Sequence, residues 1–133
     1  MYKSLIEEAV RARENSYCKY SGFAVGAALL CDDGEIFTGC NIENISYSLT
    51  NCAERTAIFK AVSEGKKDFT AIAVVGAVKS GDPLEELCFP CGACLQVMSE
   101  YCGPDFRVVL VNRGEEKVFA FSELMPRVFN SEF

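Results

Sequence analysis

Three cysteines in two separate segments constrain the fold of this chain more than any other feature. Cys52 begins the run Cys52-Ala53-Glu54, and Pro90-Cys91-Gly92-Ala93-Cys94 supplies two more thiols much later in the chain. Three thiolates can bind one metal ion only if the two segments meet in space. A structural zinc site is closed by four protein ligands, whereas three ligands leave a position for water that zinc activates near neutral pH. The pattern therefore predicts a fold that joins these segments and a hydrolytic zinc site.

Length and charge narrow the class of protein. At 133 residues, half of them hydrophobic, the chain suits one core, so we expect a single domain over residues 1–133. Its formal net charge of −6 argues against a nucleic-acid partner, because phosphate binding needs clustered Lys and Arg. No apolar run is long enough to span a bilayer, and the first residues lack the layout of a signal peptide. We therefore expect a cytoplasmic protein with no membrane partner.

The residue types limit the chemistry. The sequence has eight cysteines and no histidine. Long apolar segments supply the core that disulfide scaffolds lack, which favours reduced thiols. Without histidine, Ser-His-Asp and Cys-His systems are excluded, so only carboxylates, Lys, Cys or Tyr can move protons.

Hydrophobic periodicity predicts an α/β protein with a mixed sheet between helices. The apolar stretch 71–78 suits a central strand, and the last two strands are joined too closely for a parallel crossover, so they should be antiparallel. This gives a three-layer α/β/α fold with a five-stranded mixed sheet and helices on both faces. The expected order is helix 3–15, strands 23–31 and 35–40, helix 52–63, strand 71–78, helix 90–101, strands 106–111 and 117–121, and a helix 122–125 that Ser122 caps and Pro126 limits.

Two of the predicted helices begin at the cysteines. Right-handed crossovers through these helices place both N-termini at the same edge of the sheet. Each N-terminus carries about half a positive charge, which lowers the pKa of a nearby thiol. Zinc with three thiolates still has a formal charge of −1, and Arg55 is the candidate to neutralise it. Glu54, two residues after Cys52, is placed to exchange protons with water at the open position, although a solvated helix carboxylate is the alternative.

The second cysteine segment contains an ambiguity. Cys88 and Cys91 form one Cys-x-x-Cys pair, and Cys91 and Cys94 form another, so Cys88 is an alternative ligand to Cys94. Pro90 suits the first turn of a helix, which puts Cys91 and Cys94 one turn apart and leaves Cys88 in the preceding loop. We favour Cys91 and Cys94. The remaining cysteines, including Cys88, are expected to be buried apolar thiols: Cys18, Cys31, Cys40, Cys88 and Cys102.

Cys-Ala-Glu with Pro-Cys-x-x-Cys resembles the signature of zinc-dependent nucleoside and nucleobase deaminases. The resemblance extends from Tyr20-Ser21-x-Phe23 to Leu124-Met125-Pro126-x-x-Phe129 and is to the small homotetrameric cytidine deaminases. It implies one Zn²⁺ per subunit and hydrolytic deamination of cytidine and deoxycytidine at C4, with Glu54 carrying protons to N3 and to the departing amine. The predicted final antiparallel hairpin fits this branch rather than the tRNA adenosine deaminases, which supports a free nucleoside as substrate.

The same resemblance assigns the substrate contacts. It places Asn41 and Glu43 at the ribose hydroxyl, Phe23 on the pyrimidine, and Phe129 in the site of a neighbouring subunit; Tyr47 is a further candidate on the sugar side. A strand-exit turn is the alternative role for Asn41 and Glu43, and core packing is the alternative for both phenylalanines.

One position departs from the family pattern. Leu95 stands where many members have an arginine, which leaves Arg55 as the main candidate for thiolate neutralisation.

Two other functions remain open. One is a deaminase of another cytosine compound, such as the antibiotic blasticidin S, although Asn41, Glu43 and Phe129 favour cytidine. The other is a non-catalytic module in which Cys88 or Cys102 completes a four-thiolate zinc or iron–sulfur site. Ferredoxin-type spacing would place its fourth cysteine at Met98, which argues against that module.

Overall fold

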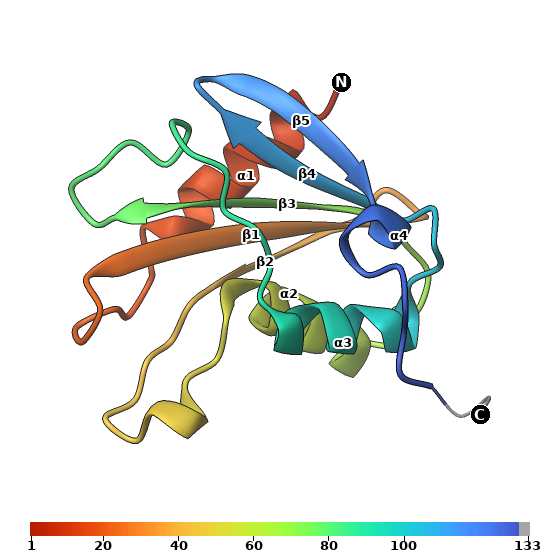
Figure 1. Ribbon diagram of the computed structural model, residues 1–133, viewed down its shortest axis with the longest axis horizontal. Coiled ribbons are helices and arrows are strands. Elements are labelled where there is room, and N and C mark those ends of the chain that lie inside the picture. The colour runs from red at the N-terminus through yellow and green to blue at the C-terminus, as the bar shows by residue number, and fades with distance from the viewer. Residues whose placement is uncertain (131–133) are drawn as a thin grey trace.

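The computed structural model describes residues 1–130 and contains one five-stranded sheet with helices on both faces (Figure 1). Along the chain its elements are α1 (Lys3–Arg13), β1 (Phe23–Cys31), β2 (Ile36–Cys40), the 3₁₀ turn η1 (Tyr47–Leu49), α2 (Ala53–Ser63), β3 (Phe69–Val78), α3 (Gly92–Tyr101), β4 (Arg107–Asn112), β5 (Glu115–Ala120) and α4 (Phe121–Leu124).

The strand order is β2-β1-β3-β4-β5, which puts β3 at the centre of the sheet as predicted. β1 is antiparallel to both β2 and β3, β3 is parallel to β4, and β4 is antiparallel to β5. Only the two residues Arg113 and Gly114 separate β4 from β5, and Asn112 pairs with Glu115 across this turn. The mixed sheet and the antiparallel last pair are therefore confirmed.

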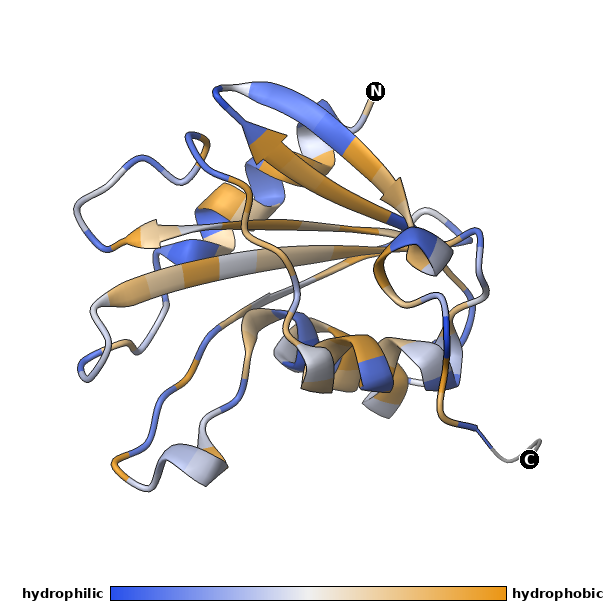
Figure 2. Ribbon diagram, in the orientation of Figure 1, coloured by the Kyte–Doolittle hydropathy of each residue, from blue (hydrophilic) through white to orange (hydrophobic). Residues whose placement is uncertain are grey.

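The two faces of the sheet are covered by different helices, which confirms the three-layer prediction. α1 lies on one face, whereas α2 and α3 lie on the other (Figure 1). Figure 2 shows that β4 is mostly hydrophobic, whereas the first part of the edge strand β5 is hydrophilic. Burial on both faces explains the nearly continuous apolar sequence of β3 and β4.

α1 packs very closely on β1. A Cβ atom placed on Gly26 would lie 2.0 Å from the carbonyl oxygen of Ala9 and 2.7 Å from the backbone nitrogen of Arg13. Only a residue without a side chain fits between this helix and the strand. Gly26 therefore fixes the distance of α1 from the sheet.

Two predicted helix starts were wrong. α3 begins at Gly92, so Pro90 precedes the helix instead of standing in its first turn; Cys91 between them is the extended N-cap residue (φ −73°, ψ 169°). α4 begins at Phe121, because burial of that side chain and a hydrogen bond from its N–H to the carbonyl of Phe106 (2.7 Å) start the helix one residue early. Glu123 rather than Ser122 caps it, accepting a hydrogen bond from the N–H of Ala120 at 2.9 Å.

Within residues 1–130, none of the helices combines the length and the hydrophobicity that a membrane crossing requires.

Candidate metal and catalytic site

Three thiols meet at the edge of the sheet where α2 and α3 begin. The sulfurs of Cys52, Cys91 and Cys94 all lie within 4.8 Å of one another. The Sγ atoms of Cys52 and Cys91 are 3.7 Å apart, and those of Cys91 and Cys94 are 3.6 Å apart. Within residues 1–130 this is the one group of such side chains close enough to share a metal ion, and Cys88 is outside it.

The thiol cluster has dimensions that fit zinc. With Zn–S bonds of about 2.3 Å, tetrahedral geometry separates two sulfur ligands by about 3.8 Å. The sulfur–sulfur distances of 3.7 Å between Cys52 and Cys91 and 3.6 Å between Cys91 and Cys94 are close to this value. Three sulfur donors also leave one coordination position for a small molecule.

Cys52 and Cys91 occupy equivalent positions at the two helix starts. Each is the N-cap residue, and their backbone angles are nearly the same, with φ −77° and ψ 157° for Cys52 and φ −73° and ψ 169° for Cys91. Cys94 follows in the first turn of α3. The three cysteines thus lie at the partly positive N-termini of both helices, which favour the thiolate form.

Arg55 supplies a positive charge to the cluster. Its Nη2 donates a hydrogen bond to Sγ of Cys52 at 3.1 Å. A hydrogen bond from Cys94 and this bond from Arg55 lower the pKa of Cys52 to about 5, despite burial. The pKa of Cys94 is raised, because its thiol donates to Cys52 and because it is buried. Cys52 is therefore the first of these two thiols to ionise.

Glu54 is a buried carboxyl beside this cluster. It lies in the first turn of α2, directly before Arg55, and only 4% of its surface is exposed. Burial raises the pKa of Glu54 to about 7, and the negative charge of Cys52 adds to the effect. A carboxyl with this pKa both accepts and releases a proton near neutral pH. The exposed helix carboxylate that was the alternative is excluded by its burial.

Phe23 and Asn41 lie at neighbouring strand ends and are linked to each other. Asn41 is 8% exposed, and its Nδ2 donates to the carbonyl oxygen of Phe23 at 2.8 Å. Its Oδ1 accepts from the N–H of Val25 at 2.9 Å and from the hydroxyl of Ser16. The ring of Phe23 is 40% exposed at the start of β1. Asn41 thus holds the strand that carries Phe23.

Glu43 and Tyr47 border a cavity of about 260 Å³ with Tyr20, Ser21 and Thr50. Glu43 accepts hydrogen bonds from the N–H groups of Tyr20 at 3.0 Å and Ser21 at 3.1 Å, and from the Ser21 hydroxyl. These bonds, first of all the one from the hydroxyl, lower the pKa of Glu43. The ring of Tyr47 meets that of Tyr20 edge-on, with 6.1 Å between the centroids.

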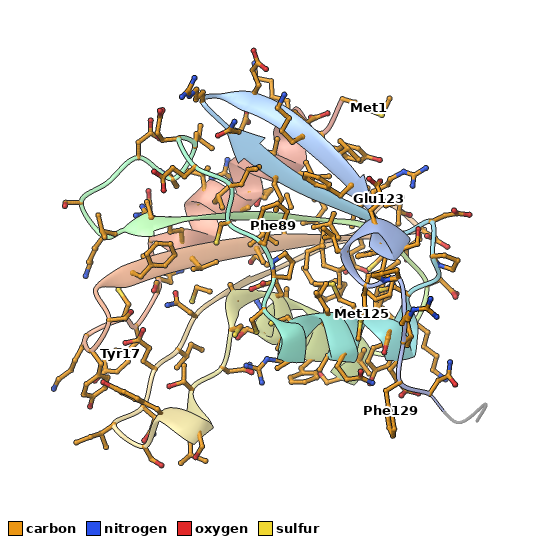
Figure 3. All side chains as sticks on the ribbon, viewed as in Figure 1. Met1, Tyr17, Phe89, Glu123, Met125 and Phe129 are labelled. Atoms are coloured by element: carbon orange, nitrogen blue, oxygen red, sulfur yellow. The ribbon has the colours of Figure 1, made fainter. Side chains whose placement is uncertain are left out.

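Phe129 is not brought to the thiol cluster of its own chain. Its side chain is 75% exposed, and Figure 3 shows the ring pointing away from α3. The carbonyl oxygen of Phe129 accepts a hydrogen bond from Nε2 of Gln96 at 3.1 Å, in the middle of α3. A contact of this ring with another subunit stays a prediction.

The sequence indicated no site role for Ser21 or Gly76, and it indicated Cys88 only as an alternative metal ligand or a buried apolar thiol. Ser21 binds Glu43, and its Oγ also accepts from the N–H of Phe23 at 3.0 Å. A glycine inside an apolar strand is a known sign of a close approach, so Gly76 carried a usable signal. Cys88 lies beside Gly76 because of the way the loop before α3 folds, and no sequence pattern indicated this position.

A buried carboxyl beside three thiols, with one coordination position left for water, is the arrangement of a hydrolytic zinc enzyme. The fold and the cluster place this chain in that class.

Comparisons with known proteins define the family. Residues 1–111 match the cytidine and deoxycytidylate deaminase zinc-binding region. The chain is similar to a cytidine deaminase of Halalkalibacterium halodurans, with 54% identity over 129 residues that cover 96% of this chain and 93% of the relative. It is also similar to the crystal structure of a cytidine deaminase from Burkholderia pseudomallei, with a TM-score of 0.86, 48% identity, and 97% of this chain and 99% of that chain covered. This chain belongs to the cytidine and deoxycytidylate deaminase family.

One relative bears on the choice of substrate. A blasticidin-S deaminase of Bacillus cereus is 38% identical over 104 residues, which cover 77% of this chain and 74% of the relative.

Proposed function

We propose that this protein hydrolyses cytidine and deoxycytidine to uridine and deoxyuridine and releases ammonia. The observation that carries the proposal is the buried carboxyl of Glu54 beside the cluster of Cys52, Cys91 and Cys94. These three cysteines would hold Zn²⁺, one ion per subunit. When bound, zinc supplies the Lewis acidity that makes water nucleophilic near neutral pH.

Glu54 moves the protons of this reaction. It takes one proton from the attacking water and delivers it to N3 of the cytosine ring, then takes the second proton of that water from the hydroxyl now on C4 and delivers it to the amine that leaves C4. The pKa of about 7 supports both directions of transfer. The overall reaction is balanced, because one nucleoside and one water give one deaminated nucleoside and one ammonia.

The other named residues bind the substrate or neutralise the charge of the thiolates. Phe23 packs on the pyrimidine ring, while Asn41 and Glu43 bind the ribose hydroxyl, with Tyr47 on the sugar side. The hydrogen bond from Arg55 to Cys52 supports a role for this guanidinium in neutralising the thiolates. Oδ1 and one N–H of the Asn41 amide already form hydrogen bonds within the protein. The second N–H of this amide is therefore the group left to bind ribose.

The assembly and location follow from the same proposal. We infer a single domain over residues 1–133, a cytoplasmic location, and a homotetramer in which Phe129 reaches the site of a neighbouring subunit. The 75% exposure of Phe129 leaves this residue accessible to a neighbouring subunit. Sedimentation analysis of the wild type and of Phe129→Ala, with cytidine turnover of each, tests this arrangement.

A second candidate substrate is blasticidin S, because one relative is a blasticidin-S deaminase. The decisive experiment measures ammonia release from cytidine, deoxycytidine and blasticidin S by the zinc-loaded protein. We expect turnover of both nucleosides. Fast turnover of the antibiotic alone would replace this proposal with the second candidate.

A further inference from the structure

Gly76 on β3 lies where three side chains converge. A Cβ atom on Gly76 would lie 2.8 Å from Sγ of Cys88, 3.0 Å from Cε1 of Phe23 and 3.1 Å from Cγ2 of Val25. Gly76 is also paired with Val25 across the sheet. The space that a side chain would fill at Gly76 is therefore taken by the Cys88 thiol and the edge of the Phe23 ring.

The Cys88 thiol also lies near the reacting carboxyl. After burial, the negative charges of Glu54 and Cys52 are the influences that raise the pKa of Cys88, to about 12. The next residue, Phe89, turns the other way and packs on Phe119 of β5, with 5.5 Å between the ring centroids. Cys88 is thus a neutral thiol, outside the metal cluster, close to both Phe23 and Glu54.

Phe23 and Gly76 border open space as well. They line part of a cavity of about 290 Å³ between the end of β3 and the loop that leads to α3. Cε1 of Phe23 and the Cys88 thiol meet at Gly76, and Phe23 also borders this open cavity. A substrate base that packs on Phe23 would therefore lie close to Cys88 and Gly76.

We propose that Cys88 and Gly76 form the wall of the base pocket that faces C5 of the pyrimidine, and that Cys88 limits the size of a substituent at C5. The inference rests on the proposed function. The reacting carbon C4 is flanked by N3, to which Glu54 delivers a proton, and by C5. The C5–C6 edge of cytosine carries no nitrogen or oxygen, so a neutral, polarisable thiol is a suitable neighbour for it.

The test compares 5-methylcytidine with cytidine as substrates. Removing the sulfur in Cys88→Ala should raise the ratio of their kcat/KM values about tenfold, because one methyl group in an apolar pocket is worth a factor of that order. Gly76→Ala moves the wall inward and should lower the same ratio. The control is Cys102→Ala, since Cys102 is a partly buried thiol of the same core at the far end of α3; its ratio should equal that of the wild type.

Two further variants separate an effect on the base pocket from an effect on folding. Cys88→Ser retains the size of the side chain if the alanine variant folds poorly, and its ratio should stay close to the wild-type value. The double variant Gly76→Ala/Cys88→Ala removes the closest predicted overlap, so its ratio should return toward that of the wild type. Turnover of cytidine by the wild type is measured first and tests the proposed function alone.

Equal ratios in Cys88→Ala and Cys102→Ala would overturn the inference. Loss of zinc from Cys88→Ala, measured by metal analysis, would overturn it as well, because Cys88 would then be a metal ligand.

Discussion

The two faces of the sheet bury different kinds of side chain. Under α1, the buried cluster is wholly apolar and rich in alanine: Leu5, Ala9, Ala28, Ala71, Ala73, Val75, Val109 and Val111. On the α2 and α3 face, the buried residues include the carboxyl of Glu54 and the thiol of Cys94. One face holds a helix at a fixed distance, whereas the other places reactive groups at its helix starts. Substitutions on the two faces should therefore damage different properties.

Among these substitutions, Glu54→Gln should have the largest effect, and it should affect only the chemical step. Glutamine keeps the size of the buried side chain but cannot carry the proton, so kcat for cytidine should fall by about 10²–10⁴-fold. Zinc content and melting temperature should stay near the wild-type values, because burial already opposes the charge of Glu54. Steady-state kinetics, metal analysis and thermal melting measure the three quantities.

Glu7→Gln is the matched control, since Glu7 is an exposed carboxylate on α1. It should leave kcat unchanged. Activity of Glu54→Gln equal to that of this control would remove Glu54 from the mechanism.

Gly26→Ala should show the opposite behaviour on the α1 face. The added Cβ would overlap two backbone atoms of α1, so the free energy of unfolding should fall by about 3 kcal/mol, the upper end of the usual overpacking cost. The folded fraction should keep the wild-type KM for cytidine. Urea denaturation measures the loss, with Gly103→Ala as control because an added Cβ there meets open space. Equal stability of the two variants would show that α1 adjusts without cost.

The contrast between the faces also separates what the sequence predicts from what it does not. Periodicity and turn residues predict the order of elements, the central β3 and the meeting of Cys52 with Cys91, because these follow from local pattern and chain connectivity. The helix starts predicted from Pro90 and Ser122 were wrong: Cys91, whose sulfur lies beside that of Cys52, is the extended N-cap of α3, and the hydrogen bond of Phe121 to Phe106 starts α4 one residue early. Position-specific packing of this kind is not encoded in a short stretch of residues.

Arg55→Gln should weaken zinc binding more than it weakens the fold. It removes the charged hydrogen bond to Sγ of Cys52, and the loss of such a supporting partner usually costs about 10–100-fold in metal affinity. Competition with a coloured chelator measures the affinity. Arg11→Gln, which changes an exposed arginine of α1, is the control and should bind zinc as the wild type does. Equal affinities would mean that the helix N-termini neutralise the thiolates without Arg55.

Ser21→Ala should have the smallest effect, a rise of KM by roughly fivefold, since one hydrogen bond is worth about 1 kcal/mol. The variant frees Glu43 and the N–H of Phe23 from the Ser21 hydroxyl. Ser63→Ala, on the exposed end of α2, is the control. No rise in KM relative to that control would remove Ser21 from substrate binding.

The same variant has a pH signature. In the wild type the pKa of Glu43 is lowered, first by the Ser21 hydroxyl, so its carboxylate bonds persist above the ordinary glutamate pKa and are lost as pH falls through the lowered value. Without the hydroxyl that pKa rises. The acid limb of the KM profile for cytidine should therefore begin at a higher pH in Ser21→Ala than in the wild type.

The paired cysteine N-caps have a consequence for local unfolding. Neither Cys52 nor Cys91 makes a side-chain capping hydrogen bond, a contact that stabilises a helix start by about 1 kcal/mol. The first turns of α2 and α3 thus depend on the metal for a constraint that serine or aspartate supplies elsewhere, and binding is thermodynamically linked to helix fraying. Amide hydrogen exchange at Glu54 and Cys94 should therefore report metal occupancy, while the amides of α1 remain insensitive to a chelator.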